Sequence, residues 1–516
     1  MNRRDFLKTT GLLAGSVALA GCTSAANKRA VKASAERPNI LFCISDDQSW
    51  LHTSINGCRA VDTPNFDRIA REGVLFTHAF CAAPSCTPSR SAILTGQEIW
   101  RVEEGGLLRG ALPSKFKVFT GLLEEAGYHV GYTHKGWDPG NYKAGGRCHN
   151  PVGSRKYSQR RLTPPAGGIK TTDYARNFEN FLNECPDGAP FFFWYGGKEP
   201  HRVYEEGSGL RAGKKLDDAN VPAFLPDTPE VRSDILDYCV EIEWFDKHLG
   251  QMLGLLERRA KLDNTIVVVT SDNGMPFPRA KTNLYDFGTR MPLAIRWAAK
   301  VKGGRAVDDF LSLTDMAPTF LEAAGLDVPE EMTGRSLLGI LLSGKSGRVD
   351  QSRNRVFTAI ERHTWCRPNG VGYPSRAIRT YRWLYIRNYE PDRWPAGDPD
   401  FDSPHQSVYG DIDNGATKTY MIEHRNDRKV QPLFELCFGK RPAEELYDVI
   451  NDPDQVNNLA GAEAFVEVKN KLRRELEQYQ RRTKDPRVEG KSPWDHYPYY
   501  SGDLWKRSAQ PAGSSS

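Results

Sequence analysis

Four apolar segments, each followed closely by polar side chains, constrain the fold of this chain more than any other feature of its sequence. They span residues 39–45, 129–133, 190–196 and 265–270. Nearly continuous apolar runs of this length are typical of strands in a sheet that is covered on both faces. Segments with helical spacing lie between them, and 231–260 is the clearest. This alternation predicts an α/β sandwich around a mostly parallel sheet.

The polar residues that follow these strands predict the position of a functional site. In an open α/β sheet, ligands bind beyond the carboxyl ends of the strands. Each residue alone could be an ordinary solvated loop residue, but together they predict one shared site. The residues concerned are Asp46, Asp47, His134, Lys135, His201, Asp272 and Asn273.

The size and charge of the chain exclude several classes of protein. With 516 residues, 39% hydrophobic and 26% charged, it suits a large globular protein with two or more structural units. Six basic and two acidic side chains fall within residues 1–36, so most of the formal net charge of +5 lies there. The remainder is nearly neutral, which argues against a nucleic-acid-binding protein.

The N-terminus has the features of an export signal. Residues 2–8 match the twin-arginine pattern, and the apolar run 11–20 is too short for a permanent membrane span. The run ends in Leu19-Ala20-Gly21-Cys22, which predicts a signal peptide over 1–21, lipidation of Cys22 and a tether over 22–36. We therefore expect a periplasmic or cell-surface protein held to the membrane only by a lipid anchor. An ordinary cleaved signal with a chance cysteine is the alternative.

The character of the sequence changes after about residue 350. Residues 381–386 and 445–448 are typical of antiparallel strands, 389–430 are rich in Pro, Gly and Asp and predict a long loop, and 462–480 fit an amphipathic helix. We therefore expect three parts beyond the tether: a catalytic domain over 37–360, a smaller α+β subdomain with an antiparallel sheet over 361–485, and a tail over 486–516.

The segment Cys86-Thr87-Pro88-Ser89-Arg90 carries the most specific chemical signal. Residues 91–94 are compatible with a helix, and Pro88 is tolerated in a first helical turn. Cys86 would then lie at a helix N-terminus, where exposed N–H groups and the helix dipole favour an anion. Arg90, one turn later, could support that anion. The alternative is an ordinary cysteine in a loop before a helix.

This segment, followed by Leu94-Thr95-Gly96, resembles the signature of the type I sulfatases, and the resemblance extends from Arg37 to about Arg482. It implies an alkaline-phosphatase-like fold. It also implies that a formylglycine-generating enzyme oxidises Cys86 to formylglycine. In the family the hydrated aldehyde attacks the sulfur of a sulfated saccharide, and the product then expels sulfate.

The same resemblance implies one Ca²⁺ ion held by Asp46, Asp47, Asp272 and Asn273, with residue 86 beside it. Four hard oxygen ligands suit Ca²⁺ better than zinc. The alternatives are a loop cap at the first pair and a simple turn at the second. A loop cap and a turn that both happen to place acidic residues at the ends of two core strands explain the pattern less well than a shared metal site does.

Further roles follow from matching positions. Lys135, Lys281 and Arg90 would hold the sulfate, Asp272 would help to deprotonate the diol, and His201 would be the general acid for the leaving group. Trp137 stands where many relatives carry a histidine that accepts a proton as sulfate is released, so that role is open. His134 is a candidate substitute, and its alternative is a strand-end residue that faces elsewhere.

A narrower resemblance concerns the segments 199–202, 220–229, 272–283 and 372–376, which are similar to the N-sulfoglucosamine sulfohydrolase branch. It implies removal of N-linked sulfate from heparan-type glucosamine, with O-sulfated polysaccharides such as algal ones left open. The remaining alternatives are a phosphatase or phosphonate monoester hydrolase of the same fold, and an inactive glycan-binding lipoprotein. Candidates for contacts with the sugar's own charges are His363, Arg367 and Arg376.

Overall fold

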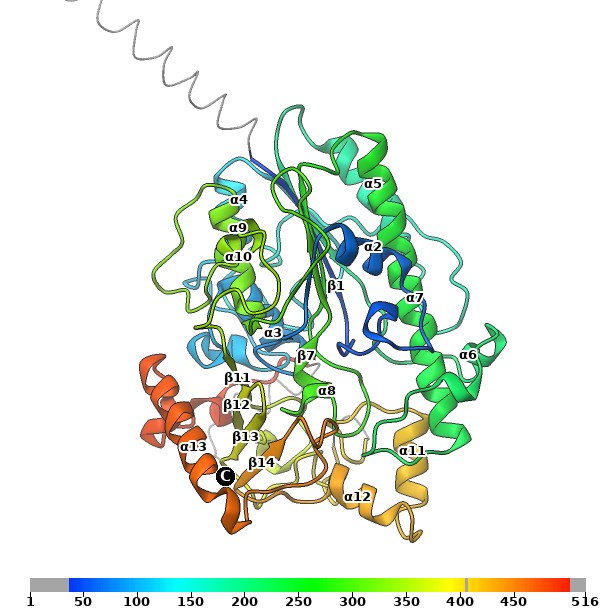
Figure 1. The fold of residues 1–516 in the computed structure, drawn as a ribbon, viewed down its shortest axis with the longest axis vertical. Helices are drawn as coiled ribbons and strands as arrows, with labels where there is room; N and C mark the ends of the chain where they lie inside the picture. Colours follow the sequence, from blue (N-terminus) through cyan, green and yellow to red (C-terminus); the bar gives the residue numbers. More distant parts are fainter. Residues whose placement is uncertain (1–36, 404–406, 502–516) are drawn as a thin grey trace, which may run out of the picture.

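The computed structural model describes residues 37–403 and 407–501. The predicted signal peptide, the tether and the lipidation site Cys22 lie outside the described residues. Within the described residues, no helix is both long and apolar enough to cross a bilayer. The chain forms a large α/β body and, below it in Figure 1, a smaller antiparallel sheet.

A seven-stranded sheet forms the centre of the body, in the order β4-β5-β1-β6-β8-β2-β9. The strands from β4 to β6 are parallel, whereas β8 runs antiparallel to both β6 and β2. The prediction of an α/β sandwich with a mostly parallel sheet is therefore confirmed. In sheet order the strands are His129–His134, Phe191–Gly196, Asn39–Ser45, Thr265–Ser271, Leu293–Arg296, Val74–Phe76 and Arg305–Val307.

Helices cover both faces of this sheet (Figure 1), which explains why its central strands are continuously apolar. Along β1, Phe42 packs into one hydrophobic cluster and Leu41 into the other, because successive strand residues point to opposite faces. The helices on the Phe42 side are α3 (Cys86–Thr95), α4 (Phe119–Glu125), α9 (Met316–Ala323) and α10 (Leu338–Leu342), and those on the Leu41 side are α2 (Pro64–Glu72), α5 (Tyr174–Glu184) and α7 (Pro229–Arg258).

Several short elements complete the body. They are a three-stranded sheet in the order β10-β3-β7 and two single-turn helices, of which α6 packs on α7. In chain order these elements are β3 (Ala79–Phe80), α6 (Ser208–Arg211), α8 (Asp286–Thr289), β7 (Arg290–Met291) and β10 (Leu311–Ser312).

The smaller sheet is a four-stranded antiparallel meander, β11-β12-β13-β14. It begins at Arg355, before the predicted boundary at 361, because residues 355–360 pair with β12. The amphipathic helix α13 packs on its face through Leu472 and Leu476. The elements are β11 (Arg355–Ile360), β12 (Ser375–Thr380), β13 (Trp383–Asn388), β14 (Glu444–Asp448) and α13 (Val466–Arg482).

Two segments are more ordered than the sequence suggested. The expected loop 389–430 contains α11 (Ala416–Glu423) and leads into α12 (Gln431–Phe438). The described part of the predicted tail, 486–501, packs on the body, with Trp494 buried in a cluster that includes Trp100. Burial of these apolar side chains holds both segments in place.

Candidate active site

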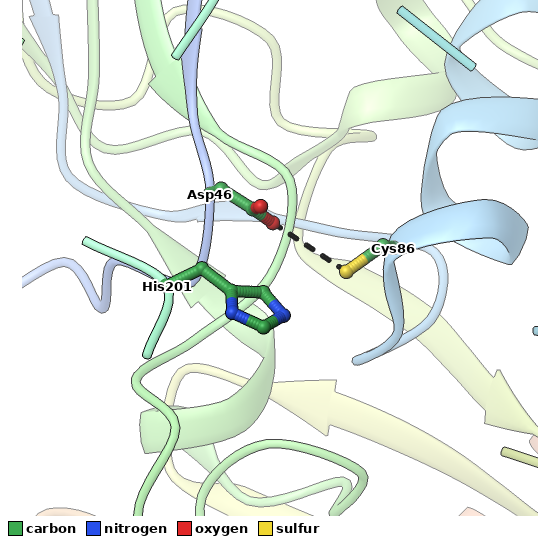
Figure 2. A group of neighbouring side chains, drawn as sticks. All are labelled: Asp46, Cys86 and His201. Atoms are coloured by element: carbon green, nitrogen blue, oxygen red, sulfur yellow. Dashed lines mark hydrogen bonds between the residues drawn. The ribbon is translucent and has the colours of Figure 1, made fainter. Parts of the chain in front are cut away.

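Cys86 is the first residue of α3, and this helix is buried along its whole length. Its thiol faces Asp46 at the end of β1, with Sγ 3.4 Å from the carboxylate Oδ1 (Figure 2). Burial raises the pKa of this thiol, so little thiolate forms at neutral pH. An unmodified Cys86 would thus be a poor nucleophile, although the helix N-terminus favours an anion there.

Three carboxylates meet beside Cys86 at the ends of β1 and β6. Single oxygens of Asp46, Asp47 and Asp272 lie within 4.8 Å of one another, and all three residues are buried. Asn273 donates through Nδ2 to Asp47 Oδ1 at 2.6 Å, whereas its Oδ1 is buried without a hydrogen-bond partner. Three carboxylates and one free amide oxygen form the donor set that a hard divalent cation such as Ca²⁺ prefers.

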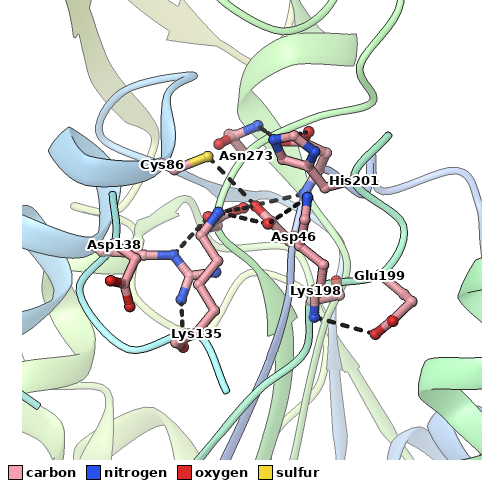
Figure 3. Close-up of polar contacts among 12 residues, drawn as sticks. Asp46, Cys86, Lys135, Asp138, Lys198, Glu199, His201 and Asn273 are labelled. Carbon is pink, nitrogen blue, oxygen red and sulfur yellow. Dashed lines mark hydrogen bonds and ion pairs between the residues drawn. The ribbon is translucent and has the colours of Figure 1, made fainter. Parts of the chain in front are cut away.

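The two predicted lysines contact these acids directly. Lys135 Nζ, following β4, lies 2.6 and 2.5 Å from the two oxygens of Asp46 (Figure 3). Lys281 Nζ lies 2.8 Å from Asp47 Oδ2 and 2.8 Å from Asp413 Oδ2. Both lysines line the same pocket as Cys86.

The two neighbouring aspartates differ in their electrostatic surroundings. Burial alone would raise the pKa of Asp46, but Lys135, together with His201 and Lys198, holds it well below its usual value. Burial raises the pKa of Asp47 to about 7, with contributions from the nearby acids, although Lys281 opposes the rise. Of these two carboxylates, Asp47 is the one less stabilised in its charged form.

The ring of His201 lies close to Asp46 and Cys86 (Figure 2), and one ligand atom of each of the three residues lies within 4.8 Å of the other two. Its Nδ1 lies 2.7 Å from the carbonyl oxygen of Arg202, so Nδ1 carries the proton, and its Nε2 lies 3.8 Å from Asp47 Oδ2. Burial, Lys281 and Lys198 lower the pKa of the ring well below its usual value. An anionic substrate among these cations would offset their effect and favour the charged ring.

Trp137 does not reach this site. Its indole is fully buried, and Nε1 donates to Ser91 Oγ of α3 at 2.7 Å. His134 does line the pocket, but burial and the nearby lysines lower its pKa to about 3. The side chain at 137 therefore supports α3 from the core side, and His134 is a neutral group in the wall of the pocket.

The expected role of Arg90 as a sulfate ligand stays a prediction, and the structure shows its contacts inside the protein. Its Nε donates to Asp272 Oδ2 at 2.7 Å and its Nη1 donates to the carbonyls of Lys135 and Gly136, while the side chain is fully buried. It does not line the pocket. Arg90 therefore orients Asp272 and the Lys135 loop, while its Nη2 is buried without a hydrogen-bond partner.

Of the three expected sugar contacts, one lines the pocket and two lie outside its lining. His363 lines the pocket, and its Nδ1 lies 2.8 Å from Ser85 Oγ. Arg367 is buried and paired with Asp411 at 2.7 Å, outside the pocket lining. Arg376 is also outside the lining and fully buried, so it is not a sugar contact. Its guanidinium pairs with two carboxylates inside the C-terminal part, those of Glu361 and Asp485.

The pocket over Cys86 has a volume of about 520 Å³ and contains groups that sequence reasoning missed. Lys198 follows β5, so the strand-end pattern could have indicated it. Its backbone N–H donates to Glu199 (Figure 3). Asp413 lies in the expected loop 389–430, where no periodic pattern singles it out. Also in the lining are Leu108, Arg109, Asp138, Pro139, Lys156, Thr364 and Tyr499.

Comparison with known protein families identifies the chain. The family model described as Sulfatase matches residues 38–326. The chain belongs to the sulfatase family. A second model, described as N-sulphoglucosamine sulphohydrolase, C-terminal, matches residues 279–431 and agrees with the narrower resemblance of the sequence. The protein is therefore an enzyme that hydrolyses sulfate esters or sulfamates, and its substrates are sulfated saccharides.

Curated relatives of this sulfatase act on different sugars. An ulvan-active sulfatase of Formosa agariphila is 28% identical over 456 residues, covering 86% of this chain and 79% of the relative. The N-sulphoglucosamine sulphohydrolase of Homo sapiens is 27% identical over 487 residues, covering 87% of this chain and 91% of the relative. Since these identities are nearly equal, they do not separate the two substrates.

Solved structures share the fold of this sulfatase. A protein in complex with its substrate D-glucosamine-2-N,6-O-disulfate aligns with a TM-score of 0.61 at 20% identity, covering 88% of this chain and all of the other. The phosphonate monoester hydrolase of Agrobacterium radiobacter aligns with a TM-score of 0.62 at 18% identity, covering 87% of this chain and 96% of the other. At such identities these similarities concern the fold alone.

Proposed function

We propose that this sulfatase removes the N-linked sulfate of a glucosamine residue in a heparan-type saccharide, using a formylglycine derived from Cys86 and one Ca²⁺ ion. The observation that carries the proposal is the position of Cys86. It lies at a buried helix N-terminus, 3.4 Å from Asp46, in a pocket that also holds Lys135, His201 and Lys281. The match of residues 279–431 to the N-sulphoglucosamine sulphohydrolase C-terminal model supports the choice of sugar.

The residues of the pocket have separate tasks in this proposal. In the hydrated formylglycine, one hydroxyl group at residue 86 would attack sulfur in line with the leaving group. Asp46, Asp47, Asp272 and Asn273 would hold the ion, which would supply Lewis-acid polarisation of the sulfate. Lys135 and Lys281 would bind sulfate oxygens.

Proton transfer to the leaving amine belongs to His201. Because Nδ1 is bound to the carbonyl of Arg202, Nε2 is the ring atom directed at the site. In its neutral form Nε2 has no proton to give, so His201 must first become charged. The negative charge of the bound sulfate favours that protonation, and the proton then passes to the amine as the nitrogen–sulfur bond breaks.

The experiment is expression with and without a formylglycine-generating enzyme, followed by mass analysis of the peptide that contains residue 86. We expect the aldehyde form only with the enzyme present, and release of sulfate from N-sulfoglucosamine that follows the aldehyde content. Cys86→Ala should lower turnover at least about a thousandfold while retaining the fold. An unmodified thiol in the maturation sample, with no sulfate released from any sulfated saccharide, would refute the proposal.

Two further substrates test the alternatives in the same assay. Faster release from ulvan fragments than from N-sulfoglucosamine would favour an O-sulfatase, as the relative in Formosa agariphila suggests. Preference for a phosphate or phosphonate monoester would favour a phosphatase or phosphonate monoester hydrolase of the same fold.

A further inference from the structure

The pocket over Cys86 contains more positive charge than its acids neutralise. Lys135 is paired with Asp46, and Lys281 is shared between Asp47 and Asp413. Beyond these pairs, the lining of the pocket has three more basic side chains, which come from three separate segments of the chain: Arg109, Lys156 and Lys198.

These three side chains have few partners. In the described part of the chain, neither Arg109 nor Lys156 forms an ion pair, and no side-chain hydrogen bond is found for either. Lys156 Nζ lies 5.7 Å from the ring centroid of Tyr132. Lys198 Nζ lies 3.9 Å from Asp46 Oδ2, a carboxylate that Lys135 already holds at 2.5 Å.

The backbone places the two lysines beside neighbouring strands of the sheet. Lys156 pairs through its backbone with Tyr132 of β4, and Lys198 follows the neighbouring strand β5. Arg109 has a φ of 55°, a left-handed conformation that is uncommon for a residue other than glycine and occurs often at functional sites.

Lys156 and Lys198 both lie near His134, which lines the same pocket. His134 lies in the same wall, and burial followed by Lys156 and Lys198 lowers its pKa to about 3. The remaining carboxylate of the lining is Asp138, which accepts the N–H of Gly136 at 3.0 Å. The five basic side chains of the lining therefore face four carboxylates, those of Asp46, Asp47, Asp138 and Asp413, so the pocket keeps an excess of positive charge.

We propose that Arg109, Lys156 and Lys198 form a second anion subsite, which binds another acidic group of the same saccharide beside the sulfate that is removed. This inference rests on the proposed function and specifies its substrate as a saccharide with at least two acidic groups. The second group is a sulfate or a carboxylate, because both present anionic oxygens that Arg and Lys bind by charge-assisted hydrogen bonds.

Binding to an inactive enzyme tests the subsite without turnover. In the Cys86→Ala background, calorimetry would compare N-sulfoglucosamine, glucosamine-2-N,6-O-disulfate and a uronic acid–N-sulfoglucosamine disaccharide. We expect Kd at least about tenfold lower for one or both of the doubly acidic ligands. Adding Arg109→Gln and Lys156→Gln should abolish this preference and change the Kd of N-sulfoglucosamine less than about twofold. If the preference for the disulfate is lost, the second group is a sulfate. If the preference for the uronic acid disaccharide is lost, it is a carboxylate.

Lys302→Gln is the matched control, since Lys302 is an exposed lysine outside the pocket and should leave all three Kd values unchanged. If the double substitution raised the Kd of all three ligands equally, or of none of them, the proposal of a second subsite would be wrong. A preference that behaves as expected, combined with no sulfate release by the mature wild-type enzyme, would leave the subsite standing and refute the proposed function instead.

Discussion

Asn273 has a buried amide oxygen without a hydrogen-bond partner, and its side chain lies beside the three carboxylates, since its Nδ2 donates to Asp47 Oδ1 at 2.6 Å. Burying a polar oxygen unpaired costs free energy, and so does keeping Asp47 charged when its pKa is raised to about 7. A divalent cation at these oxygens would remove both costs. The site is therefore expected to be more stable with the ion than without it.

Thermal unfolding in a Ca²⁺ titration of chelator-treated protein measures this effect. We expect stabilisation of about 2.7 kcal/mol at a Ca²⁺ concentration one hundred times Kd. Asn273→Ala should move the titration to higher Ca²⁺, whereas Asn457→Ala, at an exposed position, should leave it unchanged. An unfolding temperature that does not respond to Ca²⁺ in the wild type would contradict the metal assignment.

Trp137 is a second residue whose role can be measured. Because its indole is fully buried and bonded to Ser91, Trp137→His should destabilise the protein by about 2–4 kcal/mol through lost packing. It should not raise kcat, because a side chain at this position points into the core. Chemical denaturation and sulfate release would be measured together. A gain in kcat without loss of stability would mean that residue 137 reaches the pocket.

At the scale of elements, the central strands and the acids at their ends could be predicted because one physical constraint produces both. A strand buried on both faces must be apolar along its length, and parallel strands bring their carboxyl ends to one edge. Cys86, Asp46 and Lys135 therefore meet as expected. Asp413 could not be predicted, since it reaches Lys281 from an irregular segment whose path depends on tertiary packing.

The burial of Arg376 could not be predicted from the sequence either, because an arginine in a strand of mixed composition is more often exposed. On β12 it is instead fully buried, with its guanidinium between Glu361 of the strand-end loop and Asp485 near the end of α13. The side chain thus connects the sheet to the segment that follows α13.

Arg376→Met tests whether this residue is structural. Removing the guanidinium leaves the buried carboxylate of Asp485 without its ion-pair partner, whereas Glu361 keeps Arg487. The free energy of unfolding should therefore fall by about 3–5 kcal/mol while KM for the saccharide stays unchanged. Arg382→Gln is the control on the same sheet, because its partly exposed pair with Asp448 should contribute at most about 1 kcal/mol. A rise in KM with unchanged stability would return Arg376 to the substrate site.

At the scale of the whole molecule, the C-terminal part completes the pocket as well as covering one end of the body. Asp413 pairs with Lys281, and His363 lies 2.8 Å from Ser85, the residue before α3. The sulfate site should therefore depend on the contact between the two parts. That contact includes a cavity of about 890 Å³ lined by Glu98 of the body and Tyr479 of α13.

Glu98 makes this contact sensitive to pH. Its carboxylate accepts a hydrogen bond from the hydroxyl of Tyr479, and burial, with Asp315 nearby, raises its pKa from an ordinary value of 4.5 to about 7. The folded protein thus binds a proton that the unfolded chain releases between these values. Its contribution to stability is complete below pH 4.5 and is lost as the pH rises through about 7.

Glu98→Gln removes this titration while keeping an acceptor for Tyr479. We expect the substituted protein to be more stable than the wild type at pH 8, by on the order of 2 kcal/mol, with the difference vanishing near pH 4.5. Denaturant unfolding at several pH values measures it. Glu489→Gln, at an exposed carboxylate paired with Lys491, should leave the pH profile unchanged. Parallel profiles for the wild type and Glu98→Gln would show that Glu98 does not link the docking of α13 to pH.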